Sequence, residues 1–387
     1  MNSSRSVSEL PDRTARRGRS GRISAADVLG IPAIPPGAVA RGGTRMRAGV
    51  SRAADQLAMP PVRILEGIFG LLDHRVLVAL CEAGVPEALD RPMSSDDLAE
   101  QLGVDPDRLG RFLRYAVAKR WIRLDRRDRV VPTPFVEFLH RDHPGGWRAW
   151  VDFAAGEEVV RAVSALSADA SDEDGFAAVN GSPFFEWMDG HPDRWSVFDQ
   201  AMAAGGRMHG LALDATLKWK RDATICDVGG GTGDLLAVLL DRLPKATGVV
   251  FDLPSVVARA VEHERLQAIA GDAFAAVPAG FDTYLLVNVL HDWSDADSTT
   301  ILRNVVDAMA SDARVVVVDS EQQRAPRDTL GVGADVLMAA LTSGGRERSV
   351  DDFDQLGQRC GLRLVKAHRL VSGDRAYEFR LATGGTR

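Results

Sequence analysis

The apolar positions in the first third of the chain follow the order helix, helix, helix and hairpin. Apolar residues recur at helical spacing over Ile64–Leu80, which predicts one long helix. Ser94 and Asp105 are residue types that commonly cap a helix, so we expect two further helices after them. Two short apolar runs on either side of a charged turn at 125–128 predict a hairpin. This order of elements is typical of a winged helix.

Further along the chain, short apolar runs alternate with helical segments, which is typical of a doubly wound parallel sheet. The predicted strands are Ala223–Val228, Gly248–Asp252, Leu266–Ala270, Thr283–Val289 and Arg314–Ser320, followed by an antiparallel pair at Leu362–Leu370 and Ala376–Leu381. Helices are expected at about 233–243, 255–264, 296–310, 328–341 and 350–360. The fold class is therefore α/β, a Rossmann-like sheet of seven strands. A plain dinucleotide fold would instead end on a sixth parallel strand.

These patterns divide the chain into four segments. Residues 1–52 are rich in Arg, Pro, Gly and Ser and poor in large apolar residues, which predicts a disordered tail, with Met46 as an alternative start. Residues 53–150 form the winged-helix domain, 151–215 a helical linker that contributes to a substrate pocket, and 216–387 the sheet domain. The first long helix has more apolar surface than a small domain covers alone, which predicts a homodimer.

Composition narrows the class of protein. The chain has 387 residues, of which 45% are hydrophobic and 26% charged, as in an ordinary globular protein. Its apolar runs are too short to cross a membrane, and the N-terminus lacks the apolar segment of a secretory signal. A net charge of −7 disfavours a general nucleic-acid partner. The three cysteines have neither disulfide nor zinc spacing, so we expect a cytoplasmic protein without a metal site.

The candidate binding chemistry lies where the first three predicted strands end. Gly229 and Gly231 follow the first strand, where glycine lets the backbone approach a ligand closely. Asp234 takes the third glycine position of the dinucleotide fingerprint, and its charge would repel a pyrophosphate. Asp252 follows the second strand and can accept hydrogen bonds from ribose hydroxyls, whereas Asp272 follows the third and can accept one from an adenine amino group. Together they favour S-adenosylmethionine over a dinucleotide.

These motifs, in this order, resemble those of the plant-type (caffeate- and acetylserotonin-like) class I S-adenosylmethionine-dependent small-molecule O-methyltransferases, in their bacterial natural-product branch. The similar segments are DVGGGTG at 227–233, FDLP at 251–254, GDAF at 271–274, LHDWSD at 290–295 and GGRERS at 344–349. The resemblance covers about residues 55–383 and implies that the winged helix is a dimerisation domain. It implies cofactor contacts from Gly229, Gly231, Asp252, Leu253, Gly271, Asp272, Ala273, Phe274 and Asn288, and a substrate pocket with Phe198, Met202, Trp293, Met338 and Thr342.

His291 follows the fourth predicted strand, at the edge where a parallel sheet presents its ligands. A neutral imidazole can take the proton of a hydroxyl group while its oxygen attacks a methyl group, so His291 is the predicted general base. The resemblance implies that Glu321 and Glu347 flank the ring and hold it. The sequence thus predicts methyl transfer from S-adenosylmethionine to a hydroxyl, expected to be phenolic, of a small aromatic secondary metabolite.

Other functions stay open at this stage. Some relatives on this scaffold methylate carbon or catalyse reactions without methyl transfer, and the histidine favours oxygen without excluding these. A metal-dependent mechanism would use Asp292 and Asp295. A winged-helix regulator that binds DNA is an alternative from a different class, because Arg108 and Arg111 lie on the helix that would meet phosphates.

Overall fold

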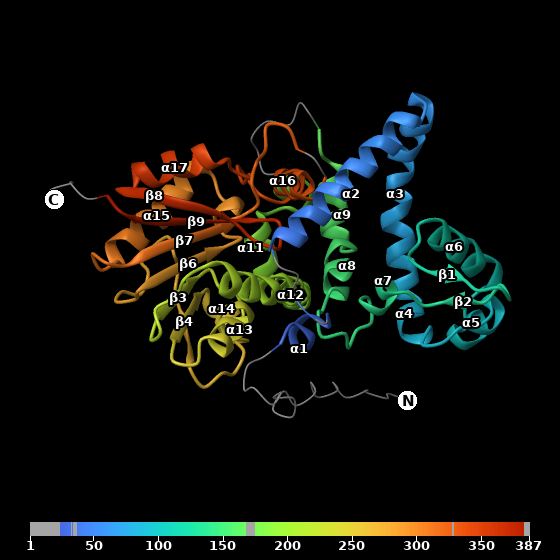
Figure 1. The fold of residues 1–387 in the computed structure, drawn as a ribbon, viewed down its shortest axis with the longest axis horizontal. Helices are drawn as coiled ribbons and strands as arrows, with labels where there is room; N and C mark the ends of the chain where they lie inside the picture. Colours follow the sequence, from blue (N-terminus) through green and yellow to red (C-terminus); the bar gives the residue numbers. More distant parts are fainter. Residues whose placement is uncertain (1–23, 32, 34–36, 168–174, 327–328, 383–387) are drawn as a thin grey trace.

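The computed structural model describes residues 24–31, 33, 37–167, 175–326 and 329–382. The helices are α1 (Ala25–Leu29), α2 (Gly37–Leu57), α3 (Pro60–Glu82), α4 (Val85–Ala88), α5 (Ser95–Leu102), α6 (Pro106–Ala118), α7 (Pro134–Glu137), α8 (Arg148–Ala154), α9 (Glu157–Ser164), α10 (Gly175–Asn180), α11 (Phe184–Asp189), α12 (Pro192–Thr216), α13 (Asp234–Arg242), α14 (Pro254–Val257), α15 (Asp295–Ala308), α16 (Leu330–Leu341) and α17 (Val350–Arg359). The strands are β1 (Arg123–Leu124), β2 (Val130–Val131), β3 (Thr224–Val228), β4 (Thr247–Asp252), β5 (Leu266–Ala270), β6 (Thr283–Val287), β7 (Arg314–Asp319), β8 (Leu362–Arg369) and β9 (Arg375–Leu381). Figure 1 shows a small helical domain beside a larger sheet domain, with α8, α9 and α12 between them.

The larger domain is built on a seven-stranded sheet of order β5-β4-β3-β6-β7-β9-β8. Strands β3 to β7 are parallel, and β9 runs antiparallel between β7 and β8. The predicted α/β class and the closing antiparallel pair are therefore confirmed. Strand β6 ends at Val287, before the predicted Val289, because Asn288 adopts a left-handed φ of 53° and the chain passes into a 3-10 turn at Leu290–Asp292.

Apolar side chains cover both faces of this sheet. Along β7, Val315 and Val317 pack in the cluster with α15 and α17, whereas Val316 and Val318 pack in the cluster with α12 and α13. This alternation follows from the pleat, which points successive side chains to opposite faces. Figure 1 shows the corresponding helices on the two sides of the sheet. Because both faces are covered, the strand reads as a continuous apolar run.

The small domain contains the elements that the apolar pattern predicts. The side chain of Ser94 accepts a hydrogen bond from the Asp97 amide at the start of α5, and Asp105 accepts one from the Arg108 amide at the start of α6. Strands β1 and β2 pair as an antiparallel hairpin. The core of this domain draws on α3, α4, α5, α6 and β2. Among the described residues, no helix has both the length and the apolar character needed to cross a membrane.

Two expectations are corrected by the structure. The predicted tail 1–52 contains α1 and most of α2, while residues 1–23 lie outside the described residues. Helix α1 forms because Ser24 closes a capping box and because Val28 and Leu29 are buried in a cluster with residues of α12 and α13. The helix expected at 255–264 is the single turn α14. It stops because the chain turns back to the first glycine loop, where the Val261 amide donates to the Thr232 carbonyl at 2.8 Å.

Candidate active site

A cavity of about 430 Å³ lies at the edge of the sheet where the parallel strands end. Its lining contains His291 together with every residue predicted for the cofactor and the substrate. These are Gly229 and Gly231 after β3, Asp252 and Leu253 after β4, Gly271, Asp272, Ala273 and Phe274 after β5, Asn288 and Trp293 after β6, Phe198 and Met202 on α12, and Met338 and Thr342 at the end of α16. The topology therefore brings the separate motifs of the sequence to one place.

The loop after β3 places backbone groups against the second acid. The Gly231 amide donates to Oδ2 of Asp252 at 2.7 Å, and the Leu253 amide donates to Oδ1 at 2.7 Å. Gly231 has a φ of 59°, a conformation that other residues rarely adopt. A Cβ atom on Gly230 would lie 2.8 Å from Cγ of Asp227, so the close approach of loop and strand requires glycine there. These contacts fix the Asp252 carboxylate at the cavity edge.

The negative charge of Asp234 is balanced by an arginine inside the protein. Its Oδ1 accepts a hydrogen bond from Nη1 of Arg207 at 2.9 Å, and its Oδ2 accepts one from the Thr232 hydroxyl at 2.9 Å. Arg207 also donates to the Gly145 carbonyl. The acid at the third fingerprint position thus fastens the glycine loop to α12.

The cofactor side of the cavity has an excess of buried negative charge. Asp227 is 1% exposed, and neither of its carboxylate oxygens has a hydrogen-bond partner within the described residues. Burial, with a smaller contribution from Asp252, raises the pKa of Asp227 to about 7. Burial also raises the pKa of Asp252. A ligand with positive charge would compensate these acids, so the lining fits S-adenosylmethionine, which carries both a sulfonium and an ammonium group.

His291 lies on the 3-10 turn with both ring nitrogens near carboxylates. Nδ1 donates to Oε1 of Glu347 at 3.0 Å, and Nε2 lies 3.6 Å from Oδ1 of Asp292. The turn itself is held by Arg348, which is 1% exposed and donates to the carbonyls of Leu290 at 2.6 Å and Trp293 at 2.7 Å. The GGRERS segment therefore supplies both the partner of the imidazole and the support of its loop.

The charges around His291 favour its protonated form. Burial by itself lowers the pKa of the imidazole, but the negative charge of Asp292, the hydrogen bond to Glu347 and the charge of Asp319 together raise that pKa to about 10. Burial raises the pKa of Asp292 to about 6 and that of Asp319 well above its ordinary value. Asp319 ends β7, is fully buried and has no hydrogen-bond partner in the described chain.

The expected position of Glu321 is corrected here. Its Oε2 lies 2.7 Å from Nε of Arg375 and 3.4 Å from Nη2 of Arg369, so its carboxylate forms ion pairs with the β8–β9 hairpin. The acid that accompanies Glu347 beside His291 is Asp319, two residues earlier. Alternation along the strand does not separate these two acids; Glu321 differs because β7 ends at Asp319 and the chain beyond it brings the Glu321 carboxylate to the arginines of the β8–β9 hairpin. Asp319 was not among the predicted site residues; it is an acid next to the end of the predicted strand Arg314–Ser320, and that position is the signal that would have identified it.

Aromatic side chains form the opposite part of the cavity. The Trp293 ring stacks on Phe185 with 5.6 Å between centroids and meets Phe274 edge-on at 4.8 Å. Phe198 packs against Phe184 and Phe153 in the same cluster. Thr342 donates its hydroxyl hydrogen to the Met338 carbonyl at 2.9 Å. A flat apolar molecule fits such walls, with His291 at the end nearest to the sheet.

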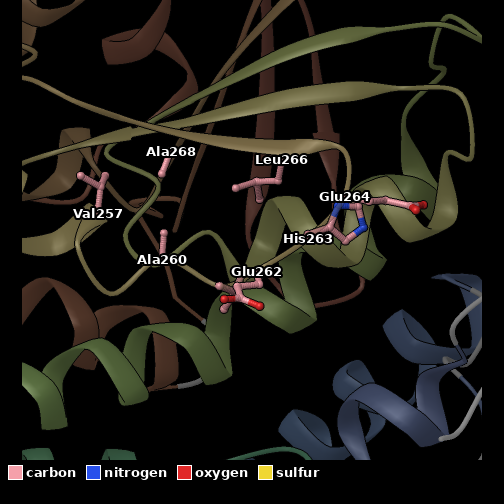
Figure 2. Close-up of a pocket in the computed structure, with 8 residues that line it drawn as sticks. Val257, Ala260, Glu262, His263, Glu264, Leu266 and Ala268 are labelled. Carbon is pink, nitrogen blue, oxygen red and sulfur yellow. The ribbon is translucent and has the colours of Figure 1, made fainter. Parts of the chain in front are cut away.

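A second hollow lies along the outer strand β5 and the segment that precedes it. Figure 2 shows its lining, which includes Val257, Ala260, His263 and Leu266. Nε2 of His263 lies 3.5 Å from Oδ1 of Asp241, on α13. This lining shares no residue with the cavity around His291, so the two hollows are distinct.

The glycine loop, the acids at the strand ends and the sheet order define a class I α/β methyltransferase. The chain belongs to the O-methyltransferase family: a sequence model of the O-methyltransferase domain matches residues 162–363, and one of the O-methyltransferase dimerisation domain matches residues 65–136. It is therefore an enzyme of this family, and its cofactor is S-adenosylmethionine.

Several characterised proteins are similar over most of their length. A mitomycin biosynthesis 6-O-methyltransferase from Streptomyces lavendulae is 31% identical over 81% of this chain and 92% of its own. An 8-amino-8-demethylriboflavin N,N-dimethyltransferase from Streptomyces davaonensis is 31% identical over 76% of this chain and 87% of its own. The crystal structure of CalO1, a methyltransferase in calicheamicin biosynthesis in its S-adenosylhomocysteine-bound form, has a TM-score of 0.74 at 27% identity and covers 83% of this chain and 98% of that one.

Proposed function

We propose that this enzyme transfers the methyl group of S-adenosylmethionine to a phenolic hydroxyl of a small aromatic natural product, with His291 as the general base. The observation that carries the proposal is the His291–Glu347 pair at the aromatic end of the cavity. Since a carboxylate only accepts hydrogen bonds, Glu347 keeps hydrogen on Nδ1 and leaves Nε2 to exchange a proton with the acceptor. The Streptomyces O-methyltransferase of mitomycin biosynthesis supports oxygen as the acceptor atom.

The proton chemistry follows from the charges around the ring. S-adenosylmethionine supplies a methyl group on a positively charged sulfur that leaves readily. A cation bound in the same cavity would disfavour the imidazolium of His291 because like charges repel, and would lower its pKa from about 10. The neutral ring then accepts the hydroxyl proton as the oxygen attacks the methyl group. Glu347 and Asp292 stabilise the imidazolium that results.

An aromatic amine is the second candidate acceptor. The N,N-dimethyltransferase relative is as similar in sequence as the O-methyltransferase relative, so the scaffold serves both atoms. An amine needs its base later than a phenol does, because its nitrogen attacks through a lone pair and loses the proton afterwards. The two acceptors therefore differ in how strongly they depend on His291.

The test is a comparison of matched acceptors. The purified enzyme is incubated with S-adenosylmethionine and with pairs of bicyclic or tricyclic aromatics that differ only in bearing a hydroxyl or an amino group. Mass spectrometry then detects a gain of one methyl group. We expect methylation of the hydroxyl compounds, lost in His291→Ala. Methylation of amines alone, or turnover unaffected by His291→Ala, would contradict the proposal.

We also propose a homodimer formed through α3. Its exposed apolar side chains face away from the rest of the described protomer and are Val62, Ile64, Leu65, Ile68, Phe69, Leu71 and Leu72. Exposed apolar patches of this kind mark protein contacts. The match of residues 65–136 to a dimerisation domain supports a second copy as the partner. We further propose a cytoplasmic location, where the three buried cysteines stay unpaired.

A further inference from the structure

The cavity contains a second histidine that is paired with a carboxylate. His209 lies on α12, lines the cavity and is 4% exposed. Its Nε2 lies 2.8 Å from Oδ2 of Asp374, in the turn between β8 and β9. Oδ1 of the same carboxylate accepts a hydrogen bond from the Ser320 hydroxyl at 2.9 Å. The pair therefore joins α12 to the end of β7 and to the last hairpin of the sheet.

The pairing with Asp374 determines which ring nitrogen of His209 is available to a ligand. Asp374 is a carboxylate: burial would raise its pKa, but the hydrogen bond and charge of His209, together with the hydrogen bond from the Ser320 hydroxyl, hold that pKa well below its ordinary value. Since a carboxylate only accepts, Nε2 of His209 carries the shared hydrogen. Nδ1 is buried and has no hydrogen-bond partner in the described residues. Buried polar atoms nearly always have a partner, so this nitrogen points to a ligand.

The helix that carries His209 lies directly against the cofactor loop. A Cβ atom on Gly210 would lie 2.7 Å from the Leu235 carbonyl oxygen, and one on Gly206 would lie 3.5 Å from Cβ of Leu235. Both glycines let α12 approach the first turn of α13, immediately after the glycine loop. His209 stands between them in the sequence, which explains how a residue so far from the sheet motifs reaches the cavity.

The remaining cavity walls are already assigned to other parts of the ligands. Asp252 and Asp272, after β4 and β5, suit the ribose and the adenine, and the aromatic walls around His291 suit the methyl acceptor. S-adenosylmethionine has a third branch on its sulfur, an amino-acid chain that ends in an ammonium and a carboxylate group. The wall made by α12 and the glycine loop is the part left for this branch.

We infer that His209, held by Asp374, hydrogen-bonds the amino-acid end of S-adenosylmethionine. This end offers both a donor and an acceptor, so either protonation state of Nδ1 finds a partner. The inference rests on the cofactor alone and not on the acceptor molecule or on the role of His291. Its failure is therefore distinguishable from a failure of the proposed function.

The experiment compares two ligands that differ only in this branch. S-adenosylhomocysteine has the amino-acid chain, whereas 5′-methylthioadenosine has a methyl group in its place. Calorimetry measures both dissociation constants for the wild type and for two matched variants. His209→Gln keeps a group near the Nε2 position and loses the one at Nδ1, while His209→Asn does the reverse.

We expect His209→Gln to weaken S-adenosylhomocysteine binding by about tenfold or more, the effect of losing a hydrogen bond to a charged group. Binding of 5′-methylthioadenosine should stay within about twofold, and His209→Asn should retain more S-adenosylhomocysteine affinity than His209→Gln. An equal loss for both ligands, or no loss for either, would overturn the inference. Should the histidine variants not fold, Asp374→Asn replaces them. It loosens the ring and is expected to lower the affinity for S-adenosylhomocysteine relative to 5′-methylthioadenosine; an unchanged ratio would also overturn it.

Discussion

His291 donates a hydrogen bond from Nδ1 to Oε1 of Glu347 at 3.0 Å, and Glu347 is itself 1% exposed. The backbone amide of Glu347 in turn donates to Oδ1 of Asp335 on α16 at 2.8 Å, so the main chain of this residue is held as well. Nδ1 is thereby engaged, and Nε2 lies 3.6 Å from Oδ1 of Asp292. The residues that suit the adenosine part of the cofactor lie at other strand ends, so the proposed role of His291 can be tested apart from them.

Removing the imidazole should affect rate and not cofactor binding. We expect His291→Ala to lower the methylation rate by about 10² to 10⁴, the usual contribution of a general base, with the affinity for S-adenosylhomocysteine, whose sulfur is uncharged, nearly unchanged. The loss should shrink as the pH approaches the pKa of the phenol, about 10, because an ionised acceptor needs no base. Steady-state kinetics between pH 6 and 10 and binding calorimetry are the measurements. A folded variant with wild-type turnover at pH 7 would end the assignment.

The charge on the cofactor should change the protonation of His291. Asp292 and Glu347 raise the pKa of the ring to about 10 against the effect of burial, and the positive sulfonium of S-adenosylmethionine opposes them. S-adenosylhomocysteine lacks this charge. NMR titration of histidine-labelled protein should therefore give a pKa for His291 that is lower with S-adenosylmethionine than with S-adenosylhomocysteine, by roughly one pH unit or more. Equal values in the two complexes would mean that the sulfonium lies too far from the ring.

Asp319 and Glu321 make a matched pair of variants, because they lie two residues apart and only the charge of Asp319 acts on His291. The charge of Asp319 helps to raise the pKa of His291, so Asp319→Asn should move the acidic limb of the pH–rate profile to lower pH. Glu321 is paired with Arg375 and Arg369. Glu321→Gln should therefore leave the pH–rate profile unchanged and lower only the free energy of unfolding, by about 1 kcal/mol or less. The reverse result would restore Glu321 as the residue that positions His291.

The strands and their terminal acids were predictable because each depends on a local run of residues. A buried parallel strand reads as one apolar run, and the residue after it reaches the cavity edge whatever the rest of the chain does. This reasoning locates Asp252, Asp272 and His291. It places the second flanking acid two positions late, because only the register of β7 with its neighbours decides which residue ends the strand.

Features that depend on distant contacts were beyond the local pattern. Helix α1 exists because Val28 and Leu29 find an apolar surface on α12 and α13, which lie almost two hundred residues further along the chain. His209 and its partner Asp374 are separated by 165 positions, and no residue near either one in the sequence indicates that they pair. Such pairs become visible only when the sheet has been assembled.

The buried carboxylate of Asp227 should destabilise the cofactor-free protein and strengthen cofactor binding. The carboxyl keeps its proton up to about pH 7 in the folded protein and loses it near pH 4 when unfolded, so the free energy of unfolding decreases as the pH rises between these values. Asp227→Asn removes this loss and should raise the free energy of unfolding of the cofactor-free protein at pH 8 by more than about 1 kcal/mol. The same variant should bind S-adenosylmethionine more weakly. Thermal unfolding with and without cofactor measures both effects. A variant with unchanged stability and unchanged cofactor affinity would show that another group compensates the charge of Asp227.

The exposed apolar face of α3 gives a direct test of assembly. Ile68 is 60% exposed in the protomer, so a charged side chain there costs the isolated protomer little. In a dimer formed through α3 the same charge would be buried without a partner, and Ile68→Glu should raise the dissociation constant of the dimer more than tenfold. Val365→Glu is the matched control, because Val365 is 46% exposed on the outer strand β8. Light scattering over a range of protein concentrations should detect dimers for the wild type and the control and monomers for Ile68→Glu. Monomeric wild-type protein at micromolar concentration would contradict the dimer. Equal behaviour of Ile68→Glu and Val365→Glu would show that the dimer contact does not involve α3.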